Sequence, residues 1–347
     1  MVIPCDAYWV GKTRSQSLCP APRRARYFNP PPPTPVAFSP YHPGNLASNA
    51  VRLSGAITPM TETSSFALIT GCSSGIGKEL AIAFAASGVT VLATARRVEL
   101  LNDLTSKYSN IEALAFELGN PSGDTESIGK LKDAVSKRTG GRLDFLVNNA
   151  GTHYASTTLD LEIKEVETLF QVNVFAVMQL CQTFMPHLRQ SPRGRIVQIG
   201  SVTRDVPMVW QGAYNASKAA LSQYSKTLRL EVKPFSIEVI EIVTGFVQSN
   251  LLHHGFHTPT TSLYLPLKKT IEDIKHRGND NGMPPDAYAR AVVAKVTKSR
   301  VSSEIWEGRL ARPIRFLVKF LPLTILNFIY YRRFKLNLLE ARGNGKH

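Results

Sequence analysis

The sequence predicts an α/β fold built on a doubly wound, parallel β-sheet. From residue 66 onward, short apolar runs alternate with longer amphipathic stretches, which is the pattern of parallel strands joined by crossover helices. The apolar runs are continuous, as expected for strands that helices cover on both faces. No internal repeat is apparent, so a solenoid or a propeller is not predicted.

Six strands are expected along the chain, each rich in Val, Ile, Leu or Phe. They are expected at residues 66–70, 89–93, 113–118, 143–147, 195–199 and 236–242. With their helices they are expected to form a single domain over residues 64–300, flanked by an extension at 1–60 and a tail at 301–347.

The two flanking segments carry most of the net charge of +15. Residues 1–60 contain a proline run and hold six Lys or Arg against one acidic residue, so we expect a disordered extension. A mitochondrial transit peptide, or a chain that starts at Met60, is the alternative. Residues 300–347 hold ten Lys or Arg against three acidic residues. This balance predicts an anionic partner, either a nucleic acid, a membrane surface or a phosphorylated substrate.

The four cysteines predict neither a disulfide framework nor a metal site. Cys5, Cys19, Cys72 and Cys181 are scattered, without a CxxC pair and without a histidine at ligand spacing. A reducing compartment is therefore expected, with Cys72 and Cys181 as buried apolar thiols.

A glycine-rich turn follows the first expected strand, and a helix opens directly after it. Gly71, Gly75 and Gly77 allow a tight turn and close backbone approach, so that a pyrophosphate can bind at the helix N-terminus. Three glycines alone are a weak signal, but this strand-to-helix context favours a dinucleotide. The expected cofactor contacts of the turn are Gly71, Ser73, Ser74, Gly75, Ile76 and Gly77.

Arg96 and Arg97 follow the second expected strand, where a dinucleotide-binding fold meets the adenosine ribose. An acidic residue there would bind the 2′-OH of NAD, whereas a guanidinium group suits the 2′-phosphate of NADP. The sequence therefore favours NADP. It leaves open which arginine makes the contact, and whether both are solvated loop residues.

Tyr214 and Lys218 lie four residues apart at the start of an expected helix, so both side chains share one helical face. A nearby ammonium group stabilises a phenolate, and we therefore expect a Tyr214 pKa below its usual value of about 10. Such a phenol can exchange a proton with a substrate oxygen. The spacing by itself is common and carries little weight.

Four motifs, taken in order, resemble the short-chain dehydrogenase/reductase family. They are TGCSSGIG at 70–77, NNAG at 148–151, Ser201 after the fifth expected strand, and YNASK at 214–218. The resemblance covers roughly residues 64–300. It implies a Rossmann-type fold with about seven strands, a nicotinamide cofactor, and a homodimer or homotetramer.

The resemblance also implies roles for individual residues. Tyr214 is the expected proton donor in reduction, Lys218 lowers its pKa and holds the nicotinamide ribose, and Ser201 orients the carbonyl. Asn173 matches the helix asparagine that supports a proton-relay water, and Asn149 matches the residue that stabilises the central strand near the cofactor. Further cofactor contacts are implied at Ala150 and Gly151.

Two positions depart from the family pattern. Glu117 stands where the family usually has an aspartate that meets the adenine, which puts that contact in doubt. Thr244-Gly245 replaces the common Pro-Gly after the sixth expected strand, so this loop is expected to be freer. Val247 and Ser249 still match positions around the nicotinamide and its phosphate.

A more detailed likeness extends nearly to the C-terminus. The ARR sequence at 95–97, VTGFVQSN at 243–250, MPPDAYA at 283–289 and a basic apolar tail resemble fungal NADPH-dependent 1-acyldihydroxyacetone phosphate reductases. This resemblance implies reduction of a ketone on an acylated, phosphorylated three-carbon unit, giving lysophosphatidic acid at the cytoplasmic face of the endoplasmic reticulum or at a lipid droplet. A cytoplasmic enzyme is the alternative, and so is a ketone of a sterol, sphingoid base or polyketide in secondary metabolism.

The apolar run at 316–331 is too short, and too interrupted by Lys319, to predict a membrane span. Its aromatic residues and flanking cations instead predict a segment that lies on a membrane or lipid-droplet surface. The alternative is a capping helix packed on the core. Nucleic-acid binding is not expected, because the cations are interleaved with aliphatic residues. A non-catalytic NADPH-binding protein of the membrane surface is the remaining hypothesis.

Overall fold

The computed structural model describes residues 65–119, 125–249, 251 and 255–339. The predicted extension at 1–60, with Cys5 and Cys19, lies outside these residues. Within them, seven parallel strands form one sheet in the order β3-β2-β1-β4-β6-β7-β9. The strands are β1 (Phe66–Ile69), β2 (Thr90–Ala95), β3 (Ile111–Ala115), β4 (Phe145–Asn148), β6 (Arg195–Ile199), β7 (Glu238–Thr244) and β9 (Glu304–Glu307). The predicted doubly wound, Rossmann-type α/β fold is confirmed.

Six of these strands overlap the six that the sequence predicts. The seventh, β9, pairs with β7 in parallel, from Glu241 opposite Glu304 to Thr244 opposite Glu307. It lies within residues 301–347, which the sequence assigned to the tail. The sheet therefore continues past residue 300, and β9 forms its edge.

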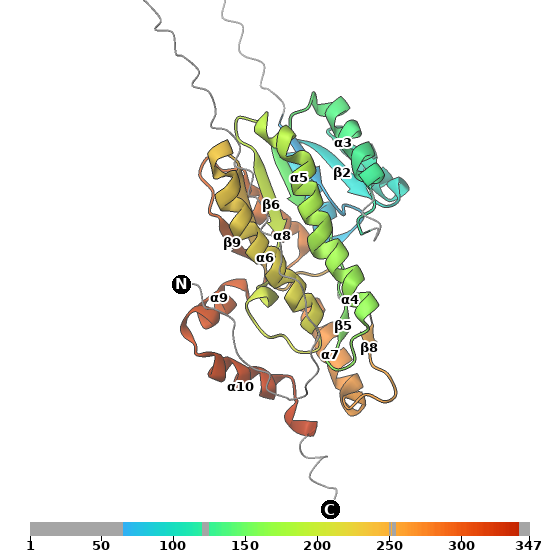
Figure 1. Cartoon of the computed structure of the whole chain (residues 1–347), viewed down its shortest axis with the longest axis vertical. Coiled ribbons are helices and arrows are strands. Elements are labelled where there is room, and N and C mark those ends of the chain that lie inside the picture. Colours follow the sequence, from blue (N-terminus) through green and yellow to red (C-terminus); the bar gives the residue numbers. More distant parts are fainter. Residues whose placement is uncertain (1–64, 120–124, 250, 252–254, 340–347) are drawn as a thin grey trace, which may run out of the picture. The chain divides into compact units, whose positions relative to one another are not determined.

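Ten α-helices occur in the described part of the chain (Figure 1). They are α1 (Gly75–Ala86), α2 (Asn102–Lys107), α3 (Thr125–Thr139), α4 (Ile163–Phe170), α5 (Ala176–Arg189), α6 (Gly212–Val232), α7 (Lys268–Asp280), α8 (Pro285–Val296), α9 (Ala311–Phe320) and α10 (Leu323–Arg333). Short 3-10 helices in the described part of the chain include η1 (Val98–Leu101), η3 (Val202–Arg204), η4 (Lys233–Phe235) and η6 (Leu265–Leu267). A π-helix, η2 (Gln171–Phe175), joins α4 to α5.

Alternate side chains of the central strands enter two different hydrophobic cores, because successive residues of a strand point to opposite faces. Ala67 and Ile69 of β1 pack in the core that includes residues of α1 and α8. Leu68 packs in the core that includes residues of α3, α5 and α6, and these three helices cover one face of the sheet in Figure 1. Burial on both faces explains why the strands read as continuous apolar runs.

The strand order reverses between β1 and β4, whose next neighbours are β2 and β6. In a doubly wound sheet, ligands bind beyond the carboxyl ends of the strands at such a switch point. A second, two-stranded sheet pairs β5 (Ala155–Ser156) with β8 (Phe256–His257) in parallel. It brings the loop after β7 to the same end of the main sheet, because β5 follows β4.

The tail folds back as α9 and α10. Ala311 and Ile314 pack with Trp306 of β9, and Phe334, just past α10, packs beside Trp210 with ring centroids 5.3 Å apart. None of the helices described here is both long and apolar enough to cross a bilayer. Cys72 and Cys181 are buried free thiols, as predicted.

Candidate active site

A cavity of about 1280 Å³ lies at the carboxyl ends of β1 and β4. Its volume exceeds the roughly 300–1,000 Å³ of a pocket for one drug-sized ligand, so it has room for a dinucleotide and a second molecule. It is lined by most of the site residues that the sequence predicts. These are Gly71, Ser73, Ser74, Gly75, Ile76, Gly77, Arg96, Glu117, Asn149, Ala150, Gly151, Ser201, Tyr214, Lys218, Val247 and Ser249.

The glycine turn between β1 and α1 requires glycine at specific places. Gly71 and Gly75 have φ angles of +73° and +56°, in the left-handed region that glycine adopts without strain. At Gly77 the constraint is space: a Cβ atom would lie 2.1 Å from the Gly71 carbonyl oxygen and 2.4 Å from Asn149 Nδ2. The backbone can therefore approach a ligand closely only while this position has no side chain.

Asn149 fixes the turn to the end of β4. Its Nδ2 donates to the carbonyl oxygens of Thr70 at 2.8 Å and Gly71 at 3.3 Å. The Thr70 hydroxyl accepts hydrogen bonds from the backbone N–H groups of Asn149 and Ala150, both at 3.0 Å. These contacts give the NNAG motif a physical role, because they hold the turn after β1 against the end of β4 at the switch point of the sheet.

The residues of this turn fit a dinucleotide. The N-terminus of α1 begins at Gly75, and its N-cap residue, Ser74, makes no side-chain capping hydrogen bond. Unpaired N–H groups at a helix N-terminus favour an anion. Gly77, which leaves no room for a side chain, lets a ligand approach the backbone, and the uncapped N–H groups of the first turn of α1 can bind an anion. Together they form a cradle for a pyrophosphate group.

The two arginines after β2 differ in position. Arg96 lines the cavity, whereas Arg97 is not among the lining residues. Both side chains are exposed. The structure therefore distinguishes the two arginines, which the sequence left equivalent, by their position relative to the cavity.

Three of the four predicted catalytic residues meet in the cavity. Tyr214 and Lys218 lie in the first turns of α6, and the Lys218 Nζ atom is 5.8 Å from the centroid of the Tyr214 ring. Lys218 donates a hydrogen bond to the carbonyl oxygen of Ile199 at 3.0 Å. Ser201 follows β6, and its side chain hydrogen-bonds with the Tyr214 phenol.

The pKa expected for Tyr214 is wrong for this structure. Burial raises the pKa of Tyr214 to about 12, and the hydrogen bond with Ser201 opposes this effect only in part. Burial likewise lowers the pKa of Lys218 to about 8, against the opposing charge of Glu241. Desolvation disfavours the charged form of each group, and it outweighs the helical proximity on which the expectation was based. Tyr214 is consequently protonated at neutral pH.

The fourth predicted residue, Asn173, does not line the cavity. It is buried in the π-helix η2, where its Nδ2 donates to Thr152 O at 3.0 Å and to Ser217 Oγ at 3.1 Å. Its Oδ1 accepts from Thr152 N at 2.9 Å. A π-helix frees main-chain groups from the regular ladder. Asn173 thus links α6, through Ser217, to the loop after β4, through Thr152.

Sequence reasoning missed several residues that line the cavity. His153 is buried, its ring centroid lies 4.7 Å from that of Tyr214, and its Nε2 shares a hydrogen bond of 3.0 Å with Gln211 Oε1. Its place two residues after the NNAG motif was a signal that could have identified it. The tail contributes a second missed set, namely Arg309, Leu310, Arg333, Phe334 and Lys335. No cluster of His, Cys, Asp or Glu able to hold a metal ion occurs in the described residues.

The sheet with its glycine cradle, together with a buried Tyr–Lys pair beside a serine, defines an oxidoreductase that uses a nicotinamide dinucleotide. The short chain dehydrogenase family model matches residues 65–259. The chain therefore belongs to the short-chain dehydrogenase/reductase family.

Relatives extend the likeness over most of the described residues. Short-chain dehydrogenase RED1 of Pyricularia oryzae is 38% identical over 284 residues, which is 80% of this chain and 98% of the relative. An NADPH-dependent 1-acyldihydroxyacetone phosphate reductase of Schizosaccharomyces pombe is 38% identical over 217 residues, covering 60% of this chain and 71% of the relative. A solved short-chain dehydrogenase from Streptomyces avermitilis, 28% identical, superposes with a TM-score of 0.65 over 83% of this chain and 100% of its own.

Proposed function

We propose that this protein reduces a ketone to an alcohol with NADPH, on an anionic, lipid-like substrate such as 1-acyldihydroxyacetone phosphate, giving lysophosphatidic acid. The observation that carries the proposal is that Ser201, Tyr214 and Lys218 line one cavity together with an apolar cluster and cations of the tail. The named activity of the S. pombe relative supports the same substrate.

Each residue of the site has a definite task in this reaction. The Ser201 hydroxyl binds the carbonyl oxygen of the substrate and orients it toward Tyr214. The Tyr214 phenol, with a pKa of about 12, holds its proton at neutral pH and delivers it to the oxygen as negative charge develops there. Lys218 places a positive charge beside that oxygen. NADPH, when bound, supplies the hydride.

NADPH is favoured over NADH because Arg96 lines the cavity beyond β2. A guanidinium group binds a 2′-phosphate with two charge-assisted hydrogen bonds. Glu117, the single carboxylate among the described residues that line the cavity, is left to meet the adenine.

Arg96→Ser is expected to raise the KM for NADPH by about 10- to 100-fold, since a hydrogen bond to a charged group contributes about 1.5–3 kcal/mol. The KM for NADH should change little, because NADH has no 2′-phosphate. Initial rates over a series of cofactor concentrations measure both. Arg97→Ser is the matched control, and an equal effect of the two variants would contradict the assignment.

One part of the cavity wall suits an apolar chain. Trp210, Phe256, Ile271 and Phe334 belong to one buried cluster and line this part of the cavity. They come from the segment before α6, from β8, from α7 and from the tail. An aliphatic chain buried against them is stabilised by about 0.8 kcal/mol for each methylene group.

Three cations lie on the tail side of the same cavity: Arg309, Arg333 and Lys335. Arg309 Nη1 donates to the carbonyl oxygen of Asn281 at 2.7 Å, while Arg333 and Lys335 are exposed. Their positive charge complements an anionic group such as a phosphate. A ketone that carries both an acyl chain and a phosphate meets both features of the cavity.

The proposal is tested with purified protein, NADPH and a panel of ketones, by following the absorbance of the reduced nicotinamide. 1-Acyldihydroxyacetone phosphate should be reduced with a lower KM than its dephosphorylated form. A preference for sterol, sphingoid or polyketide ketones would replace this substrate by the second candidate. Absence of turnover on the whole panel, with NADPH still bound, would favour a non-catalytic NADPH-binding protein. The proposal includes a homodimer or homotetramer, as the family resemblance implies.

A further part of the proposal is that the tail docks on the cytoplasmic face of the endoplasmic reticulum or on a lipid droplet. The large apolar side chains of α9 and α10 that remain exposed are Phe316, Phe320, Leu323, Ile325, Phe328 and Ile329, at 40–65% exposure. Residues 308–339 contain no acidic residue and seven Lys or Arg. Apolar side chains flanked by cations favour an anionic lipid surface. The inner face of both helices packs on the core, so the two alternatives for the tail are compatible.

Flotation with vesicles of phosphatidylcholine and phosphatidylserine tests this docking. The wild-type protein should float, and less of it at high salt, because salt screens the attraction to anionic lipid. Phe316→Ser with Phe320→Ser should abolish flotation. Leu230→Ser, at a site on α6 that is 72% exposed, is the control and should float as the wild type does. If the wild type and both variants float equally, or if none of them floats, docking through the tail is contradicted. The alternative is then a cytoplasmic enzyme that does not bind a lipid surface.

A further inference from the structure

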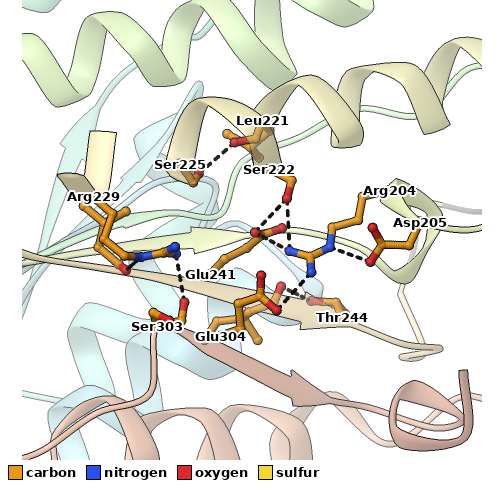
Figure 2. A network of polar contacts seen from close by, with 12 residues as sticks. Arg204, Asp205, Leu221, Ser222, Ser225, Arg229, Glu241, Thr244, Ser303 and Glu304 are labelled. Carbon is orange, nitrogen blue, oxygen red and sulfur yellow. Dashed lines mark hydrogen bonds and ion pairs between the residues drawn. The ribbon is translucent and has the colours of Figure 1, made fainter. Parts of the chain in front are cut away.

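Two charged residues outside the predicted site, Arg204 and Glu241, are buried close to the predicted catalytic residues. Figure 2 shows their polar contacts. Arg204 ends the 3-10 helix η3, three residues after Ser201, and its side chain is 4% exposed. Glu241 lies in the middle of β7 with a fully buried side chain, at 0% exposure. Buried charges are costly unless they are paired, so their location calls for an explanation.

Arg204 joins four elements of the fold. Its Nη1 forms an ion pair with Glu241 Oε2 on β7 and donates to Ser222 Oγ on α6 at 3.0 Å. Its Nη2 lies 3.1 Å from Glu304 Oε2 on β9, and its Nε donates to Asp205 Oδ2 at 2.8 Å. Figure 2 shows the guanidinium group at the centre of these partners. One side chain thus connects the turn after Ser201 to the catalytic helix and to the two last strands.

Glu241 contacts the same turn from the other side. Its Oε2 also accepts a hydrogen bond from Ser222 Oγ at 3.0 Å. Its Oε1 lies against Gly200, where a Cβ atom would approach it to 2.6 Å. This oxygen has no hydrogen-bond partner among the described residues. The carboxylate therefore touches the residue before Ser201 and pairs with Arg204 after it.

We propose that Arg204 and Glu241 are a positioning pair: together they fix the turn that carries Ser201 against the helix that carries Tyr214 and Lys218. The proposal rests on the proposed function, because it concerns how that site is held. Neither residue lines the cavity, so both act through Ser201 and α6 and do not contact the substrate.

The charge of Glu241 has a second effect on the site. The titratable groups that face Lys218 include Tyr214 on its own helix and Glu241 on β7, and Arg204 of η3 is paired to Glu241. Burial lowers the pKa of Lys218 to about 8, and Glu241 opposes this fall. Loss of the Glu241 charge therefore lowers the pKa of Lys218 further. The ammonium group would then be lost at a lower pH.

The test compares Glu241→Gln, which keeps the shape, with the double variant Arg204→Met, Glu241→Leu, which replaces the pair by apolar groups. Both should lower kcat by about 10- to 100-fold, since a small misplacement of a catalytic group has an effect of this size. The basic limb of the pH–rate profile should move to lower pH in Glu241→Gln, and less in the double variant, which also removes the opposing positive charge of Arg204. Thermal unfolding of the double variant should stay near that of the wild type, because apolar replacement of a buried ion pair is often tolerated.

A second ion pair, which joins β6 to β7, provides the matched control. Arg195 of β6 is 1% exposed and bonds Glu238 of β7 at 2.6 Å, at the opposite ends of these strands from the cavity. Glu238→Gln should leave kcat and the pH profile at their wild-type values. If Glu241→Gln resembles Glu238→Gln in both measurements, Arg204 and Glu241 are only a structural pair and the proposal is wrong.

NMR titration of the Lys218 side-chain amine, without substrate, separates this proposal from the proposed function. A lower Lys218 pKa in Glu241→Gln supports the effect of Glu241 even if no ketone in the panel is reduced. An unchanged Lys218 pKa contradicts that effect even in an enzyme that reduces acyldihydroxyacetone phosphate. Absence of turnover in the wild-type protein contradicts only the proposed function.

Discussion

Replacing Tyr214 by phenylalanine is expected to lower kcat by about 10²- to 10⁴-fold, the usual contribution of a general acid. The ring would keep its packing in the cluster with Leu169 and Ala213, so the fold and the cofactor cradle should persist. Only the proton donor is removed. Because the Tyr214 pKa is raised to about 12, the group is protonated over the whole neutral range, and the loss should be seen throughout that range.

Initial rates of NADPH consumption measure the loss, and quenching of protein fluorescence by NADPH measures whether cofactor affinity is retained. Tyr154→Phe is the matched control. That tyrosine packs against the same cluster, and its hydroxyl accepts a hydrogen bond from Glu162 N at 3.1 Å, but it does not line the cavity. A Tyr214→Phe enzyme as fast as the Tyr154→Phe enzyme would remove Tyr214 from the mechanism.

Replacing Gly77 by alanine is expected to weaken NADPH binding by about 10- to 100-fold. The new methyl group would lie 2.1 Å from the Gly71 carbonyl oxygen and 2.4 Å from Asn149 Nδ2. Both neighbours are held by the contacts between the turn and β4, so the turn must move. Such overpacking costs about 1–3 kcal/mol. If this free energy is lost from NADPH binding at the glycine turn, the dissociation constant rises by about the expected factor.

Fluorescence titration with NADPH measures the dissociation constant, and thermal unfolding shows whether the domain remains folded. Gly129→Ala is the control, because a Cβ atom at Gly129 meets nothing within 4 Å in the helix α3. That variant should bind NADPH normally and be slightly more stable. Normal NADPH affinity in Gly77→Ala would mean that the pyrophosphate is bound elsewhere.

Periodicity and turn chemistry were sufficient to predict most of the sheet. Strands buried on both faces leave long apolar runs, and six of them were recognised from the sequence. The seventh, β9, has only four residues, Glu304–Glu307, with a glutamate at each end. It is partly exposed at both ends, as an edge strand can be. A segment of this length with a polar residue at each end has no sequence pattern that distinguishes a strand from a loop.

The contacts within one motif could be predicted, whereas contacts between distant segments could not. The glycine turn and the Tyr214–Lys218 spacing are local, and the cavity contains both. Phe334 meets Trp210 across more than a hundred residues, and no local pattern encodes that contact. Arg204 and Glu241 are 37 residues apart, and each alone looks like an ordinary polar residue of a loop or a strand.

The pKa of Tyr214 shows a different limit. Spacing identifies which charges are neighbours, and it correctly placed Lys218 near the Tyr214 ring. It does not report how completely the surrounding chain excludes water. Burial has the larger effect on both groups, and burial is a property of the assembled fold.

The position of β9 at the edge of the sheet has a consequence for biosynthesis. A ribosome makes residues 238–244 some sixty residues before residues 304–307, so β7 emerges as an open edge of the growing sheet. Open edges invite pairing with other chains, and charged side chains discourage it. Glu238 and Glu241 both lie on β7, so this strand carries charged side chains of the kind that discourage such pairing.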